Sequence, residues 1–153
     1  MTPPTPRRPF NPPLLLLTAI VAMTSLHSVF PFARLIDGPW RFLGLMPALI
    51  GLGLNIWGSR LFEKRQTTIK PTGHSSTLVL EGAFLYTRNP MYLGMTLILI
   101  GIALGLGTLS PWLVIPIFVL GIQERFIKME ERKMESEFGA EYNAYKQKVR
   151  RWL

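Results

Sequence analysis

The sequence predicts an all-α, polytopic membrane protein with about four transmembrane helices and a C-terminal amphipathic helical lid. Three observations support this fold class. Nearly half of the residues, 48%, are apolar, and they gather in long runs without charge. The 17 Lys and Arg residues, against 9 Asp and Glu, lie mainly in the segments that flank these runs. From residue 123 onward the chain becomes abruptly charged.

At 153 residues the chain has the length of one domain, in which we distinguish three parts. Residues 1–13 form a basic arm with six prolines and two arginines, a composition typical of a disordered segment. Residues 14–126 are expected to hold the transmembrane helices and their loops. Residues 127–153 are expected to form an amphipathic tail.

Residues 14–32 and 42–59 predict the first two spans. The first run has 19 uncharged residues, enough for about 28 Å of helix. The second run has Trp40 and Trp57 near its ends, where tryptophan anchors a helix at the membrane surface. Its glycines, at positions 44, 51, 53 and 58, predict close packing against another helix. His27, inside the first run, is expected to face the membrane interface.

Residues 91–122 predict a helical hairpin. This run has 32 residues without a charge. In one helix they would measure about 48 Å, which exceeds the hydrocarbon core. Ser110-Pro111 is a turn signal near the middle of the run. We therefore expect two short or tilted spans, the second of which continues to about Phe126.

The tail carries an apolar stripe at helical spacing. Its residues recur at intervals of three or four: Met134, Phe138, Tyr142, Tyr145 and Val149. Gly139 is expected to break the tail into two shorter helices. Two interpretations remain open. The tail lies on the membrane surface, or it packs as a lid against the long loop between residues 60 and 88.

The distribution of basic residues predicts the orientation in the membrane. Lys and Arg number two in the arm, two in residues 34–41, five in residues 60–88, none at the hairpin turn and eight in the tail. Since basic residues concentrate in cytoplasmic loops, both termini and the long loop are expected to be cytoplasmic. Membrane lipids with anionic headgroups, rather than nucleic acid, are the expected partners of this basic surface.

The residue types exclude several kinds of chemistry. The chain has no cysteine, which excludes disulfides, thiolate nucleophiles and Cys-ligated metals. The two histidines, His27 and His74, are far apart in the sequence, so no metal site is expected.

Residues 88–94 lie where a basic loop meets a long apolar run. Asn89 can cap the helix that starts here, and Pro90 suits the first helical position. Two interpretations of the segment remain open. Arg88 and Tyr92 anchor the helix at the membrane surface, or Arg88 and the positive end of the helix dipole receive an anion such as a carboxylate.

Two blocks of the sequence resemble one family. Gly82-Ala83-Phe84, followed by Arg88-Asn89-Pro90-Met91-Tyr92-Leu93-Gly94, resembles the G-x-Y/F-x-x-x-R-H/N-P-x-Y-x-G signature of integral-membrane methyltransferases. This group comprises the isoprenylcysteine carboxyl methyltransferases and the phospholipid methyltransferases. The second block runs from Glu130-Glu131 through Met134, Phe138-Gly139 and Glu141-Tyr142 to Tyr145 and Val149. The resemblance covers roughly residues 43–153. It implies a bacterial-type member of the family, which would be a multi-pass protein of the inner membrane.

The resemblance implies an S-adenosylmethionine-dependent methyltransferase that acts on the carboxylate or amine of a lipidic or amphipathic acceptor. It implies cofactor contacts from Ser76, Thr77, Leu78, Val79, Phe84, Asn89, Pro90, Met91, Tyr92, Glu130 and Glu131. Arg88 and Arg125 are the catalytic candidates, and Arg125 is the nearest match to a family arginine that precedes the acidic pair. Phe84 stands where tyrosine is commoner. Asn89 stands where prenylcysteine enzymes have histidine, which argues against a prenylcysteine substrate.

Two alternatives to this function remain open. The first is a phospholipid N-methyltransferase. The second is a small membrane scaffold or transporter subunit without catalytic activity. A transporter is expected to have ionisable residues within its spans, and His27 is the one such residue in the predicted spans.

Overall fold

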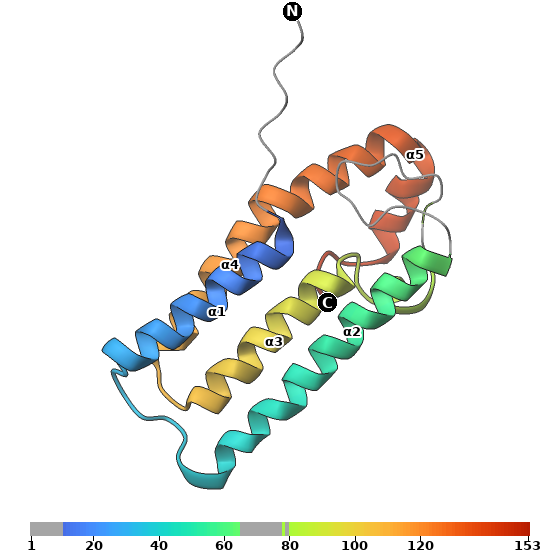
Figure 1. Cartoon of the computed structure of the whole chain (residues 1–153). Helices are drawn as coiled ribbons and strands as arrows, with labels where there is room; N and C mark the ends of the chain where they lie inside the picture. Colours follow the sequence, from blue (N-terminus) through green and yellow to red (C-terminus); the bar gives the residue numbers. More distant parts are fainter. Residues whose placement is uncertain (1–10, 65–77, 79) are drawn as a thin grey trace, which may run out of the picture.

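The computed structural model describes residues 11–64, 78 and 80–153, and within these residues the regular secondary structure is helical. The α-helices are α1 (Pro12–Val29), α2 (Leu45–Lys64), α3 (Pro90–Leu106), α4 (Val114–Ile122) and α5 (Lys128–Lys148). Figure 1 shows α1 to α4 lying side by side, with α5 continuing from α4 and folding back at its far end. The predicted all-α class is confirmed.

Two stretches of the described chain are long and apolar enough to cross a membrane. They are α1 and the segment Gly38–Lys64, which contains α2. Many of their large apolar side chains are exposed, among them Leu17, Val21 and Leu49. Large exposed apolar patches of this kind mark membrane or protein interaction sites. The helices α3, with 17 residues, and α4, with 9, are apolar but shorter. The structure therefore supports membrane association, and the number of four spans stays a prediction.

The first two helices have different bounds from those expected. The helix α1 ends at Val29, because Pro31 disfavours the helical conformation in Phe30 before it. The second run begins as a 3₁₀-helix at Gly38–Gly44 and continues as α2 to Lys64. The predicted end at residue 59 was too early, because charged residues can continue a helix beyond the apolar run.

Glycines bring α2 and α3 into backbone contact. A Cβ atom on Gly51 would lie 2.3 Å from the carbonyl oxygen of Gly94. A Cβ atom on Gly101 would lie 2.5 Å from the carbonyl oxygen of Gly44. Neither position has space for a side chain, so the predicted close packing is confirmed for Gly44, Gly51 and Gly58, whereas a Cβ atom on Gly53 would meet nothing within 4 Å.

The turn of the hairpin is tied to the end of α1. The helix α3 ends at Leu106 and is followed by Gly107, which has φ of 73° and forms a left-handed C-cap. Nδ1 of His27 lies 2.8 Å from Oγ1 of Thr108, at hydrogen-bonding distance. Oγ of Ser110 donates to the carbonyl oxygen of Leu26. The contact with Thr108 joins His27 to the hairpin turn, and the expected position of His27 at the membrane interface stays a prediction.

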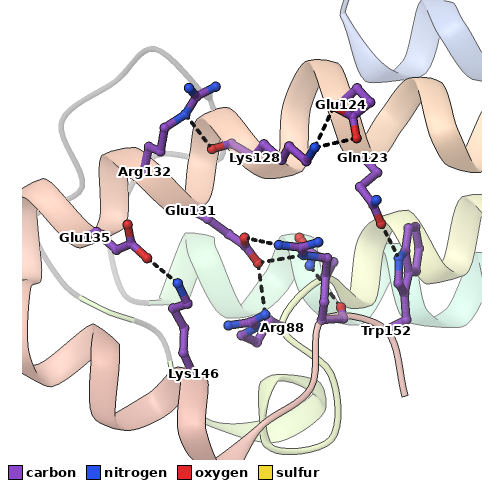
Figure 2. Close-up of polar contacts among 11 residues, drawn as sticks. Arg88, Gln123, Glu124, Lys128, Glu131, Arg132, Glu135, Lys146 and Trp152 are labelled. Atoms are coloured by element: carbon purple, nitrogen blue, oxygen red, sulfur yellow. Dashed lines mark hydrogen bonds and ion pairs between the residues drawn. The ribbon is translucent and has the colours of Figure 1, made fainter.

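The helix α4 passes into α5 without a break, through one turn of π-helix at Gln123–Ile127. The boundary expected near Phe126 is therefore not a helix end. Gly139 has φ of 50° and ψ of −116°, which interrupts α5 as predicted. Beyond this kink, Lys146 forms an ion pair with Glu135 before it (Figure 2), and this contact joins the two halves of α5.

Candidate functional site

The candidate site lies where the start of α3 meets the first turns of α5 and the segment that follows α5. A short 3₁₀-helix, Gly82–Leu85, leads the chain toward α3. The segment after α5, residues 150–152, then crosses residues 87–89 and makes hydrogen bonds to them. Parts of the chain that are far apart in sequence thus converge at one end of the helix bundle.

Arg88 is the centre of the site. Its Nη2 atom lies 3.1 Å from Oε1 of Glu131, and its side chain is only 9% exposed (Figure 2). The Nε and Nη1 atoms of Arg88 are buried and have no hydrogen-bond partner among the described residues. A buried N–H group without an acceptor costs roughly 1–3 kcal/mol. The guanidinium group is therefore suited to an additional acceptor, and a carboxylate forms strong charge-assisted hydrogen bonds with such a donor.

Glu131 is held between two arginines. Nε and Nη2 of Arg151 donate to its two carboxylate oxygens over 3.0 and 2.6 Å. Burial raises the pKa of Glu131, but the Arg151 hydrogen bonds and the charges of Arg88 and Arg151 together lower it below the usual range. Glu131 is therefore ionised, and the protein's own guanidinium groups occupy its oxygens.

Glu130, next to it in the sequence, has a different environment. The hydroxyl group of Tyr92 donates to Oε1 of Glu130 over 2.6 Å, which joins α3 to α5. Burial raises the pKa of Glu130 to about 7, although the Tyr92 hydrogen bond and the charge of Lys133 oppose this change. Glu130 can therefore gain or lose a proton near neutral pH. The structure brings together Arg88, Tyr92 and both glutamates, as the motifs predicted.

Asn89 has a different role from the one expected. Its side chain makes no capping hydrogen bond to α3. Instead, Nδ2 of Asn89 donates to the carbonyl oxygen of Arg151 over 3.0 Å. Pro90 does open α3 as predicted. The first N–H groups of α3 have no intrahelical partner, as at any helix start, and the Asn89 side chain does not accept from them, so they add to the positive potential beside Arg88.

The tail packs against the protein, as the lid interpretation expected. Tyr142, Tyr145 and Val149 are buried in one cluster. Leu78 and Leu80 of the long loop pack against this cluster, and so do Met134 and Phe138 from the tail itself. The hydroxyl group of Tyr145 also donates to the carbonyl oxygen of Phe84 over 2.6 Å. The Phe84 side chain is buried and meets Phe62 edge to face, so these contacts connect the tail to the first motif.

Some of the predicted site residues lie elsewhere. Ser76, Thr77 and Val79 lie outside the described residues. Met91 is half-buried, and its side chain lies against Gly58 of α2. Arg125 is exposed on the π-helical turn and forms no ion pair with any described residue. Its role as a catalytic residue stays a prediction.

Sequence reasoning missed Arg151, which makes two hydrogen bonds with Glu131 at the centre of the site. It lies in a stretch of basic residues whose members are otherwise mostly exposed, and the residue type alone does not distinguish it. Thr87 was also missed, and its hydroxyl group donates to the carbonyl oxygen of Arg151 over 3.2 Å. Trp152 was the one residue type in this segment to indicate that it packs against the protein, because an aromatic side chain there follows a charged stretch. Its Nε1 atom donates to Gln123 (Figure 2).

Comparisons with known proteins identify the family of the chain. Residues 39–141 match the family model of the phospholipid methyltransferases. A protein of Haemophilus influenzae, described as an uncharacterized protein, is 52% identical over 63 residues, which are all of that protein and 41% of this chain. No solved structure matches the chain. The family model covers more than half of the chain and includes Arg88, Tyr92 and both glutamates, so the chain belongs to the phospholipid methyltransferase family.

Proposed function

We propose that this protein is an S-adenosylmethionine-dependent methyltransferase of the membrane, with a lipidic or amphipathic molecule as the methyl acceptor. One observation carries the proposal beyond family membership. Arg88 is buried at the start of α3, and two of its guanidinium nitrogens have no acceptor among the described residues. The cofactor's methionine end carries a carboxylate, an acceptor with which either of these donors can form a charge-assisted hydrogen bond.

The other residues of the site fit the remaining parts of this cofactor. Glu130 can accept a hydrogen bond from the cofactor's amine or from a ribose hydroxyl group. Leu78, Phe84 and Tyr92 offer apolar surface for a flat ring system. When bound, S-adenosylmethionine supplies a methyl group on a positively charged sulfur. The protein's own task is to hold donor and acceptor in line and to keep water away, which accelerates such a transfer.

The acceptor decides whether a proton must also move. A carboxylate acceptor carries no proton to lose, so Arg88 and Glu130 would only have to position the reacting groups. An amine acceptor must lose a proton, and Glu130, with a pKa of about 7, is suited to take it. This property and the phospholipid methyltransferase family favour a phospholipid amine as the second candidate acceptor.

Isothermal titration of the detergent-solubilised protein with S-adenosylmethionine tests the proposal. Arg88→Ala and Glu130→Gln each remove one charge-assisted contact, worth about 1.5–3 kcal/mol. Each variant should therefore bind roughly ten- to a hundredfold more weakly. Arg132→Ala and Glu124→Gln are matched controls, because both side chains are exposed on the same helical stretch outside the site.

Two results would contradict the proposal. The wild-type protein could fail to bind S-adenosylmethionine, as a scaffold without catalytic activity would. Alternatively, Arg88→Ala and Glu130→Gln could bind as tightly as their controls, which would place the cofactor elsewhere. Circular dichroism of all four variants verifies that each remains helical.

A further inference from the structure

We propose that Arg151 is a positioning residue that keeps the Arg88 guanidinium group available to the ligand. The inference rests on the proposed function, because it takes the ligand's carboxylate as the partner of Arg88. Three charges meet at this point, and Glu131 lies between the two arginines. The way in which the two arginines share the carboxylate decides which of their nitrogens remain free.

The sharing is unequal. Arg151 contacts both oxygens of Glu131, through Nε to Oε1 over 3.0 Å and through Nη2 to Oε2 over 2.6 Å. Arg88 reaches only Oε1, through Nη2 over 3.1 Å. Arginine and carboxylate prefer the paired arrangement that Arg151 forms here. Because Arg151 occupies that arrangement, Arg88 makes a single contact and its Nε and Nη1 atoms stay unpaired.

Removal of Arg151 has a defined consequence. A buried guanidinium group next to one free carboxylate would form the paired arrangement itself. Arg88 would then turn a second nitrogen toward Glu131, so one of the two nitrogens that are now free would no longer be available to a ligand. Arg151 therefore acts through Glu131 on Arg88 and does not have to touch the ligand.

Main-chain contacts hold Arg151 in place independently of its side chain. The carbonyl oxygen of Arg150 accepts from the N–H group of Arg88 over 3.0 Å. The carbonyl oxygen of Arg151 accepts from Asn89 and from Thr87. Trp152 packs against the main apolar core. These contacts remain when the Arg151 side chain is truncated, so Arg151→Ala should retain the fold.

The inference is tested by titrating the detergent-solubilised full chain with two probes, S-adenosylmethionine and its decarboxylated form. Arg151→Ala should weaken the binding of S-adenosylmethionine about tenfold, the effect of losing one charge-assisted contact. It should leave the decarboxylated form unaffected, because that probe has no carboxylate for Arg88. Arg151→Lys should not restore the binding, because an ammonium group cannot form the paired contact.

Two further variants distinguish positioning from a general structural effect. Arg150→Ala is the control, because that side chain is exposed and Arg150 contacts the site through its main chain alone. In an Arg88→Ala background, the additional change Arg151→Ala should have no further effect on the binding of S-adenosylmethionine, since both changes act on one contact.

The outcomes separate this inference from the proposed function. If the wild-type protein does not bind S-adenosylmethionine, the proposed function is wrong and the inference falls with it. If the wild-type protein binds but Arg151→Ala behaves like Arg150→Ala, the inference alone is overturned. Equal weakening of both probes by Arg151→Ala would also overturn it, because a general loss of structure does not depend on the carboxylate.

Discussion

Glu130 and Glu131 are neighbours in the sequence, yet the fold gives them opposite properties. Two guanidinium groups lower the pKa of Glu131, whereas burial raises the pKa of Glu130 to about 7. Adjacent residues on a helix point about 100° apart, which directs the first toward α3 and the second toward the segment after α5. Pairs of ionisable groups whose pKa values are pushed apart are typical of sites that bind or move charge.

The raised pKa of Glu130 predicts how stability depends on pH. Between pH 4.5, where the carboxyl group ionises in the unfolded chain, and pH 7, the folded state holds a proton that the unfolded state releases. As the pH rises through this range, the free energy of unfolding of the wild-type protein should therefore fall relative to that of Glu130→Gln, because residue 130 of the variant does not titrate. Above pH 7 the variant should be more stable by about 1–3 kcal/mol, and below pH 4.5 the difference should vanish.

Thermal unfolding in detergent at a series of pH values measures this difference. Glu124→Gln is the control, because Glu124 is exposed, and it should follow the wild-type protein between pH 4.5 and pH 7. A Glu130→Gln profile parallel to that of the wild-type protein would show that Glu130 is not in a desolvated environment.

The sequence identified only some of the site residues, and the reason is physical. Arg88, Tyr92 and Glu130 lie in motifs whose spacing is visible in the chain, and the structure brings them together. The contact of Arg151 with Glu131 depends on the kink at Gly139, which turns the chain back toward α3. The sequence indicates the kink but not the direction in which the chain continues, so Arg151 could not be placed.

At the scale of the elements, the apolar runs predicted the helices better than their ends. The hairpin turn was expected around Ser110-Pro111, and the chain turns there, between Gly107, whose left-handed conformation suits glycine, and the 3₁₀-helix Ser110–Leu113. The π-helical turn at Gln123–Ile127 was not predicted, because its residues are equally compatible with an α-helix. Periodicity therefore determines which segments are helical, while local backbone geometry determines where they bend.

The contact between α2 and α3 predicts an unequal effect of two substitutions in one helix. Gly51→Ala would place a Cβ atom 2.3 Å from a backbone oxygen of α3, so the helices would have to separate. This should destabilise the protein by about 1–3 kcal/mol. Gly53→Ala is the matched control, because nothing lies within 4 Å of its Cβ position. It should leave the protein equally stable or slightly more stable.

The free energy of unfolding of both variants can be measured by denaturant titration in detergent micelles. Equal stability of Gly51→Ala and Gly53→Ala would mean that α2 and α3 do not approach as closely as the structure describes.

At the scale of the whole molecule, the basic residues and the helix arrangement make a joint prediction about topology. The start of α3 and the segment after α5 meet in one site, so they must lie on the same side of the membrane. The hairpin turn lies at the other end of α3 and has no charged residue. Reporter fusions truncated after Ser110 and after Leu153 should therefore report opposite sides, with the second in the cytoplasm. Signals from the same side would contradict the hairpin.

The backbone contact between α2 and α3 also restricts how a lipid could travel to the site. At Gly51 of α2, at Gly44 of the 3₁₀-helix that leads into it, and at Gly94 and Gly101 of α3, the backbones approach so closely that not even a methyl group fits between them. An acyl chain is far wider than a methyl group, so a lipid in the bilayer cannot pass between these two helices. Any membrane-borne acceptor must therefore reach the site from another side of the helix bundle. Glycines that the acceptor never contacts thus restrict its route of entry.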